Sequence, residues 1–261
     1  MKLRIPTVRA VMDRRILVNF RVDPTTLARI IPEPFRVKRV HCWGVAGVCL
    51  IRLRNSRPKG LPAALGQTSE NAACRIAVEW DENGATKEGV YIPLRHTNSR
   101  LNALAGGRIF PGVHALSQFD IHECGGLYKI KMRTTRGDQD LKLLGRETDA
   151  WPKDSIFADP HEASEFFRNG CVGYSQTQDP EKHEGLELHP FDWDATPLHI
   201  EHIAARFFND PETFPPGSCR FDSAMLMRDI DHEWRTLPPL HAAPASQCIR
   251  SAQPTCIHMK T

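Results

Sequence analysis

Arg14-Arg-Ile-Leu-Val-Asn-Phe-Arg-Val-Asp-Pro-Thr-Thr-Leu-Ala-Arg-Ile-Ile-Pro-Glu-Pro-Phe35 is the stretch that decides the fold. It predicts an apolar strand over 15–22 that leads into a short helix over 24–31. The side chain of Asp23 can accept hydrogen bonds from the first helical turn, where Pro24 needs no donor of its own. The apolar residues of the helix recur at helical spacing, at Leu27, Ile30 and Ile31. The prolines that follow them end the helix.

This segment resembles the opening of the acetoacetate decarboxylase-like superfamily. In that superfamily a strand ending Tyr/Phe-Arg-x-Asp is followed by a short helix and a Pro-Glu-Pro-Leu-type stop. Segments between about residue 12 and about residue 234 can be matched to the family in order, most firmly over 14–36, 88–114 and 163–193. The resemblance implies a cone-shaped barrel that encloses a small cavity.

A second stretch is similar to the middle of the family: Glu88-Gly-Val-Tyr-Ile-Pro-Leu-Arg-His-Thr-Asn-Ser-Arg-Leu-Asn-Ala-Leu-Ala-Gly-Gly-Arg-Ile-Phe-Pro-Gly112. In the true decarboxylases a lysine follows the proline and forms a Schiff base with the keto acid. Gly112 and Val113 stand there in this chain, and glycine has no amine to offer. The chain is therefore closer to the uncharacterised YqjF-like branch, which lacks the lysine, and we expect no Schiff-base decarboxylation.

The rest of the chain alternates between apolar and polar residues in many short segments that Gly, Pro, Asn and Asp separate. Together with the resemblance, this predicts an α+β fold that is predominantly antiparallel β with a few peripheral helices. Further strands are predicted over 37–54, 72–80, 88–95, 113–122, 126–135, 140–147, 171–178 and 220–231. Further helices are predicted over 97–106, 160–168 and 199–208. We expect a single domain over 1–235 and a Pro/Ala-rich tail over 236–261, where apolar periodicity is lost.

The charge, apolar content and cysteines of the chain indicate which kinds of partner and surroundings to expect. The net charge is +3 and basic residues form no long run, so we expect no nucleic-acid partner. No stretch approaches the roughly 20 apolar residues that span a membrane. The eight cysteines include no Cys-x-x-Cys pair, and the chain starts without a signal-peptide-like apolar run. We therefore expect free thiols in the cytoplasm. Strand edges and the habits of relatives predict a homo-oligomer.

Four arginine and glutamate positions are candidates through the resemblance. Glu70 matches the family's glutamate at the head of a central strand, and Arg75 matches an arginine that is common in the YqjF-like branch. Arg108 matches the arginine of the family's Gly-Arg pair, which stands shortly before the corner formed by Phe110 and Pro111. Arg14 lies near the carboxylate-binding arginine of the decarboxylases, with a register difference of about one residue. Guanidinium groups recognise carboxylates, and a partly buried glutamate can act as acid or base. The alternative for Glu70 and Arg75 is a structural ion pair.

Two histidines are further candidates. His114 follows the position of the missing lysine by two residues and could replace it as an acid or base, since histidine titrates near neutrality. Arg95 and His96 end the strand over 88–95 and must face opposite ways. Because Tyr91 and Pro93 share the parity of Arg95, we favour His96 as the ligand-binding residue. Satisfied structural histidines are the alternative.

Other chemistries have weaker signals. Lys129 and Lys131 share one face of a strand and could form an imine if that face lined the cavity. His199 and His202 have the helical spacing of two metal ligands, but no further ligands stand at a recognised spacing. No phosphate-binding loop, dinucleotide fingerprint or Gly-x-Ser-x-Gly motif is present, so we expect neither a metal nor a cofactor.

These expectations combine into one hypothesis and one rival. The hypothesis is a barrel that binds a small carboxylated organic molecule, with lyase-like acid-base catalysis by Glu70 and His114 and with ligand-binding roles for Arg14, Arg75, His96 and Arg108. The rival is a non-catalytic barrel that senses or carries a small ligand. The two differ in whether a titratable residue of shifted pKa lies beside an arginine in a closed cavity.

Overall fold

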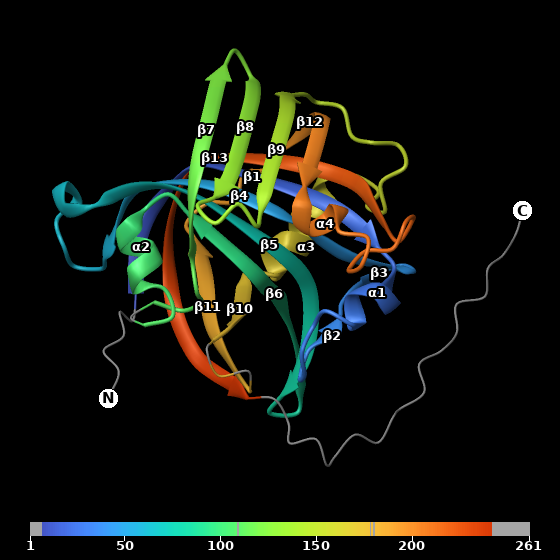
Figure 1. Ribbon diagram of the computed structural model, residues 1–261, viewed down its shortest axis with the longest axis horizontal. Helices are drawn as coiled ribbons and strands as arrows, with labels where there is room; N and C mark the ends of the chain where they lie inside the picture. The colour runs from blue at the N-terminus through green and yellow to red at the C-terminus, as the bar shows by residue number, and fades with distance from the viewer. Residues whose placement is uncertain (1–6, 109, 178, 180, 242–261) are drawn as a thin grey trace, which may run out of the picture.

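The computed structural model describes residues 7–108, 110–177, 179 and 181–241, and its strands form one thirteen-stranded sheet. Four short helices and a 3₁₀ turn accompany the sheet (Figure 1). The strands are β1 (Thr7–Val22), β2 (Arg36–Val37), β3 (Arg39–Val40), β4 (Trp43–Pro58), β5 (Gln67–Glu82), β6 (Ala85–Thr97), β7 (Ala115–Cys124), β8 (Leu127–Thr134), β9 (Asp140–Glu147), β10 (Val172–Gln176), β11 (Lys182–Pro190), β12 (Thr196–Ala205) and β13 (Cys219–His241). The helices are α1 (Pro24–Ala28), α2 (Arg100–Ala105), α3 (Pro160–Asn169) and α4 (Arg206–Asn209), and the 3₁₀ turn is η1 (Ala63–Leu65).

Strand pairing closes a ring. β5, β6, β10, β11, β13, β1 and β4 pair in that order, and β4 returns to β5. The strands β7, β8, β9 and β12 form a second path from β6 to β13. Each end of this path is held by a short ladder, at His96–Ala115 and Thr97–Leu116, and at Thr196–Leu226 and Pro197–Met225. The predicted α+β, predominantly antiparallel fold is confirmed, although the strands do not form a regular barrel.

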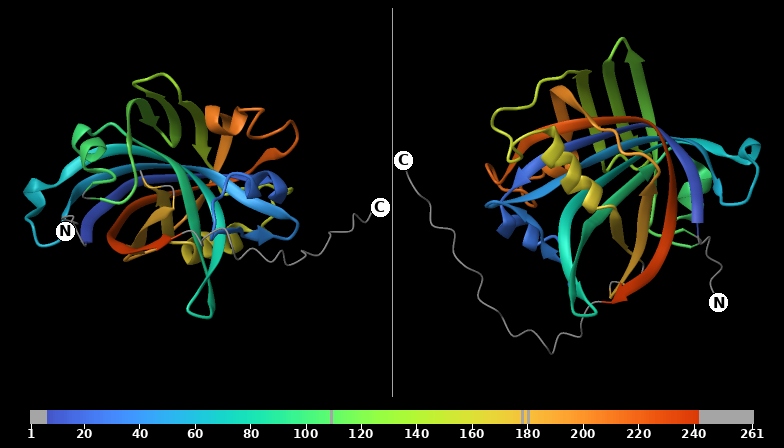
Figure 2. Two further views of the ribbon diagram at one scale, coloured as in Figure 1. Left: turned by 60° about the horizontal axis from the view of Figure 1, so that its bottom comes forward. Right: turned by 180° about the vertical axis from the view of Figure 1, so that it is seen from behind.

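The two faces of β1, β4 and β5 pack differently. One face carries Ile16, Val48 and Ile76, which belong to the main apolar core beneath β8 and β9. The other face carries Leu17 and Cys49, which pack beside the aromatic residues of α3. Figure 2 shows α3 lying across the sheet in the view from behind. Burial of apolar side chains on both faces makes the ring strands the central layer of the molecule.

Several predicted elements are confirmed and one is wrong. The strand over 140–147 and the helix that begins at Pro160 are found where the sequence predicts them, and Asp159 caps that helix through Glu162 N at 2.8 Å. The helix predicted over 199–208 is instead β12 up to residue 205, because the strand pairs with β9 along Leu198–Ala205. Pairing with β9 satisfies backbone groups that a short isolated helix would hold only weakly.

The last strand extends past the predicted domain boundary. β13 continues to His241, so residues 236–241 belong to the sheet, while 242–261 of the predicted tail lie outside the described residues.

No helix in the described ranges is long and apolar enough to cross a membrane. The expected free thiols are found at Cys49, Cys74, Cys124, Cys171 and Cys219, whereas Cys248 and Cys256 are not among the described residues.

Candidate functional site

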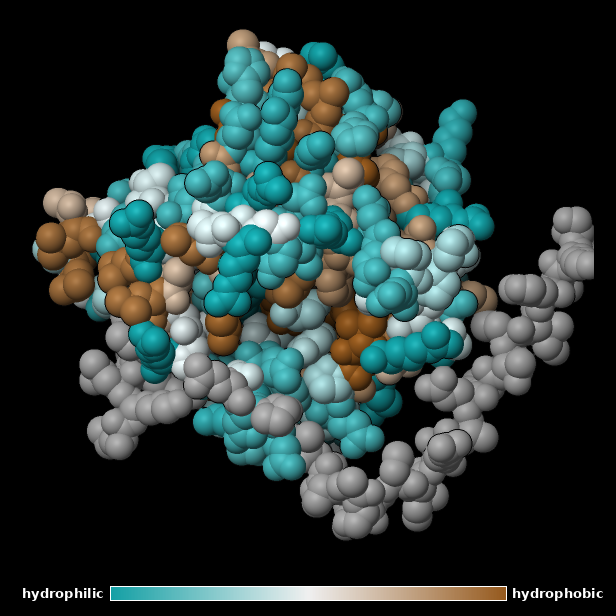
Figure 3. Space-filling model, viewed as in Figure 1, coloured by the Kyte–Doolittle hydropathy of each residue, from teal (hydrophilic) through white to brown (hydrophobic). Residues whose placement is uncertain are grey.

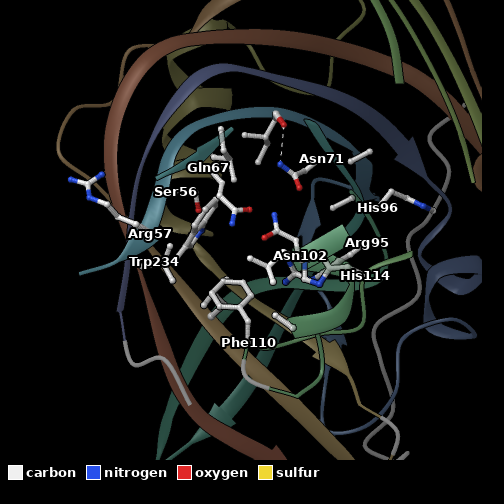
Figure 4. Close-up of a pocket in the computed structure, with 18 of the residues that line it drawn as sticks. Ser56, Arg57, Gln67, Asn71, Arg95, His96, Asn102, Phe110, His114 and Trp234 are labelled. Atoms are coloured by element: carbon white, nitrogen blue, oxygen red, sulfur yellow. Dashed lines mark hydrogen bonds between the residues drawn. The ribbon is translucent and has the colours of Figure 1, made fainter. Parts of the chain in front are cut away.

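A cavity of about 230 Å³ lies within the strand ring. Six ring strands contribute to its wall (β1, β4, β5, β6, β11 and β13), and α2 with the segment after it covers one side (Figure 4). Most of the lining is apolar. The polar side chains that line it include Gln67, Asn71, Arg95, Asn102 and His114. A concave, mostly apolar site with a few convergent polar groups is typical of a small-molecule binding site.

The segment after β6 positions the covering helix. Ser99 caps α2 by accepting a hydrogen bond from Asn102 N at 3.2 Å, and Asn98 Oδ1 accepts one from Glu70 N at 2.9 Å. Asn102 reaches Ser69 Oγ at 3.4 Å, and Asn71 donates to the same oxygen at 3.0 Å. These bonds hold two side-chain amides at the cavity wall, where they can donate to or accept from a ligand.

A bulge in β6 turns Arg95 into the cavity. Ile76 pairs with Tyr91 and Cys74 pairs with Leu94, so β6 has one extra residue between these two pairs. The extra residue lies beside Pro93, which cannot donate to a ladder and is tolerated at bulges. Tyr91 and Leu94 therefore face the main core together. Arg95, next along the chain, faces the opposite side with Ala73.

Arg95 is a cavity cation without a carboxylate partner in the described ranges. Its Nε donates to Ser175 Oγ at 2.9 Å, which uses one of five guanidinium N–H donors. Loss of hydration lowers the pKa of Arg95 to about 10, so the group is still charged at neutral pH. A partly buried guanidinium with donors to spare is suited to bind a planar anion.

His114 lies beside Arg95 and is neutral. Its Nδ1 is 3.0 Å from the carbonyl oxygen of Gly112, which can only accept, so Nδ1 carries the proton and Nε2 keeps a lone pair. Burial, followed by the nearby positive charge of Arg95, lowers the pKa of His114 to about 3. Figure 4 shows the two side chains next to each other. The site thus places a fixed cation beside an unprotonated ring nitrogen.

His96 faces away from this pair. It is among the lining residues, but Figure 4 shows its ring pointing away from the other labelled side chains. The ring lies 3.4 Å from Ser117 Oγ, and burial lowers the pKa of His96 to about 4. Arg95 and His96 do face opposite ways, as the sequence predicts, but the bulge gives the inward position to Arg95. The parity count that favoured His96 over Arg95 crossed this bulge, which reverses the alternation of side chains.

Glu70 and Arg14 are brought together, but outside the cavity lining. Arg14, Arg52 and Glu70 are cross-strand neighbours on β1, β4 and β5. Arg14 Nη2 lies 2.6 Å from Glu70 Oε2, and Arg52 Nε binds the other carboxylate oxygen. Both arginines also contact Glu123 of β7. Two guanidinium groups thus occupy the Glu70 carboxylate, and these partners are Arg14 and Arg52 rather than Arg75, with which the alternative prediction paired it.

Arg75 and Arg108 do not line the cavity. Arg75 is buried on the cavity side of β5, where it donates to Asn19 Oδ1 and lies 4.4 Å from the ring centre of Phe167. Its Nε has no hydrogen-bond partner, and burial lowers its pKa to about 10. Arg108 lies exposed in the turn after α2. Of the six predicted site residues, His96 and His114 are among the described residues that line the cavity.

The metal and imine alternatives have no support from the site. His199 and His202 lie exposed on β12, a strand, so the helical spacing predicted for them is wrong. Within the described residues, no three His, Cys, Asp or Glu side chains gather as metal ligands. Lys129 and Lys131 are both exposed on β8, and the described cavity lining includes no lysine.

Comparison with known proteins gives a result only at the level of structure. No protein-family model matches the sequence, and no curated protein matches it. An acetoacetate decarboxylase from Legionella pneumophila superposes with a TM-score of 0.57 at 12% identity, covering 90% of this chain and 88% of that chain. An acetoacetate decarboxylase-like enzyme from Sphingomonas wittichii RW1 gives 0.54 at 13% identity, with 91% and 92% covered.

A third similar structure is the enduracididine biosynthesis enzyme MppR complexed with pyruvate. It superposes with a TM-score of 0.50 at 11% identity and covers 92% of this chain and 91% of that chain. At such low identities the likeness concerns the course of the backbone. The chain therefore has the fold of the acetoacetate decarboxylase-like enzymes.

Proposed function

We propose that the chain binds a small carboxylated organic molecule in the cavity, with the carboxylate on Arg95. The observation that carries the proposal is the inward-facing guanidinium of Arg95, which has no ion-pair partner among the described residues. A carboxylate would supply the missing counter-charge through two parallel hydrogen bonds. The likeness to a structure that holds pyruvate supports a ligand of this kind.

The surroundings of the cavity favour an anion. The described lining includes no aspartate or glutamate. Arg15 and Arg75 lie near Cys49, which lines the cavity, and neither has an ion pair with a carboxylate among the described residues. Arg15 Nε instead contacts the sulfur of Cys49 at 3.4 Å. Uncompensated positive charge in a poorly hydrated site attracts an anion more strongly than the same charge in water would.

The proposed chemistry is proton transfer without an imine. Nε2 of His114 would take a proton from the ligand while Arg95 holds the carboxylate, and the amides of Asn71 and Asn102 would bind a carbonyl or hydroxyl oxygen. Gly112 offers no amine, in agreement with the proposed affiliation to the YqjF-like branch. Glu70 is left out of this role because Arg14 and Arg52 occupy its carboxylate.

Calorimetric titration tests the binding proposal. Acetate, propanoate, pyruvate and benzoate would be compared with their uncharged amides. We expect the acids to bind and Arg95→Gln to weaken them by about 10- to 100-fold, the range for a hydrogen-bonded charge. The matched control is Arg108→Gln, at an exposed position outside the lining, which should leave affinity unchanged. Equal affinity for Arg95→Gln and the unmodified chain would refute the proposal.

A second measurement separates the enzyme from the carrier. Acetate and propanoate would be followed by proton NMR in D₂O for exchange of the hydrogens on the carbon next to the carboxylate, pyruvate for exchange of its methyl hydrogens beside the keto group, and all four acids for conversion. We expect exchange that His114→Asn abolishes while binding survives. Binding without exchange or conversion of any acid in the panel would instead support the sensing or carrier function. The homo-oligomer and the cytoplasmic location remain predictions.

A further inference from the structure

The cavity has two chemically different ends. Arg95 and His114 stand at one end, and Trp234 stands at the other, with Gln67 and Asn102 between them in Figure 4. Ser56 and Arg57 of β4 also stand beside Trp234, where the Arg57 guanidinium donates to the backbone carbonyls of Leu61 and Asn55 (Figure 4). The apolar part of the wall around Trp234 comes from four strands that lie far apart in the sequence. Its members are Val8 of β1, Leu53 of β4, Leu186 of β11 and Trp234 of β13. A small, fully polar acid would leave this wall without a partner.

The apolar wall continues to the protein surface. Leu65 of η1 is 63% exposed and Leu101 of α2 is 53% exposed, and both line the cavity. Two further leucines, Leu61 just before η1 and Leu104 on α2, are 46% and 59% exposed without lining it. Figure 3 shows apolar residues gathered over η1 and α2 at the left of the molecule. Exposed apolar side chains that cluster at the mouth of a cavity indicate a place where a ligand covers them.

We propose that the ligand is an amphiphilic carboxylic acid, and this inference rests on the proposed function. Its carboxylate binds Arg95, and its alkyl chain or aromatic ring follows Leu53, Leu186 and Trp234 toward Leu65 and Leu101. The cavity volume equals that of about eight waters at ~30 Å³ each, so an acid of roughly eight to ten non-hydrogen atoms fills it. A longer chain emerges between the two exposed leucines.

Chain-length dependence tests this inference. The affinity of straight-chain acids from ethanoate to decanoate would be measured by calorimetry below their critical micelle concentrations. We expect the affinity to rise about two- to fourfold for each methylene up to octanoate and to level off beyond it. The double variant Leu65→Ser/Leu101→Ser should lose most of the gain between hexanoate and decanoate. It should still bind ethanoate as the unmodified chain does.

The matched control is Leu61→Ser/Leu104→Ser, which removes two exposed leucines from the same part of the surface but none from the lining. It should keep the full chain-length gain, and circular dichroism would confirm that both double variants fold. Acids that bind through Arg95 with no gain in affinity along the series would overturn this inference and leave the proposed function standing. The same holds for a gain that Leu65→Ser/Leu101→Ser does not reduce. If no acid binds, or if Arg95→Gln has no effect, both fail.

Discussion

Gly112 lies against the side chain of Arg95. A Cβ placed on Gly112 would come within 2.9 Å of Arg95 Nε, and the backbone φ of +82° belongs to the region that favours glycine. The guanidinium therefore occupies the space beside the corner where a residue-112 side chain would stand. The position that the resemblance assigns to a catalytic lysine is thus filled by a cation from the neighbouring strand.

The first prediction concerns this contact. Gly112→Ala should lower the free energy of unfolding by about 1–3 kcal/mol through backbone strain alone, and further through the clash with Arg95. Gly84→Ala is a matched control, because Gly84 has a φ of +78° and no atom near the position of a Cβ. Urea unfolding should show both losses, with the larger one at Gly112. Only Gly112→Ala should weaken carboxylate binding, and equal binding by the two variants would contradict the contact.

The second prediction concerns Glu70. Glu70→Ala should lower the free energy of unfolding by about 3 kcal/mol, because it leaves Arg14, whose side chain is 1% exposed, with one fewer carboxylate partner. Asp120→Ala removes an exposed ion pair with Lys131 and should change stability little. Affinity for acids should stay the same in both variants. A selective loss of binding or turnover in the more conservative Glu70→Gln would restore the catalytic role that the sequence predicts.

The third prediction is a loss of stability in acid. The pKa values of His96 and His232 are lowered by burial to about 4 from the ordinary 6.5. Between these values the unfolded chain binds more protons than the folded chain, so stability falls as the pH falls from about 6.5 to about 4. Each group contributes at most about 1.4 kcal/mol per pH unit. Urea unfolding across this range should show a shallower slope for His96→Gln than for the unmodified chain, with His199→Gln, at an exposed strand position, as the control.

The fourth prediction concerns the cysteines. Burial raises the pKa of Cys74 to about 12, so its thiol should react last with iodoacetamide at pH 8, whereas the exposed Cys124 should react early. Cys49 lines the cavity, and a bound acid should slow its alkylation without changing that of Cys124. Peptide mass spectrometry reads each site separately. Undiminished labelling of Cys49 at saturating acid would place the ligand elsewhere.

Local sequence patterns were enough to predict most strands. The strand over 140–147 keeps a strict alternation in the fold, and the Asp-Pro start of α3 works through its own side chain. Both signals act within a few residues, so they survive into the structure. The helix predicted over 199–208 failed because the unpaired edge of β9, which lies some sixty residues earlier in the chain, recruits that segment as a strand.

The candidate site was predictable only in part. His114 was predicted because it follows the position of the missing lysine, Gly112, by two residues, and its side chain is among those that line the cavity. Glu70 was predicted to act in the cavity, whereas its carboxylate is held by Arg14 and Arg52, on two other strands whose pairing with β5 no local pattern indicates. Arg95 was passed over although a signal was present. A proline inside a predicted strand marks a bulge, and a bulge reverses the alternation beyond it.

By itself, the sequence determined the class of fold, the order of most strands and the absence of an amine at position 112, since these depend on short-range patterns and on residue identity. Only the tertiary structure decided which charges are paired and which face the cavity. The reason is that both the pairing of charged side chains and the face of the sheet on which they lie depend on strand register. One extra residue in β6 moves every later side chain of that strand to the opposite face.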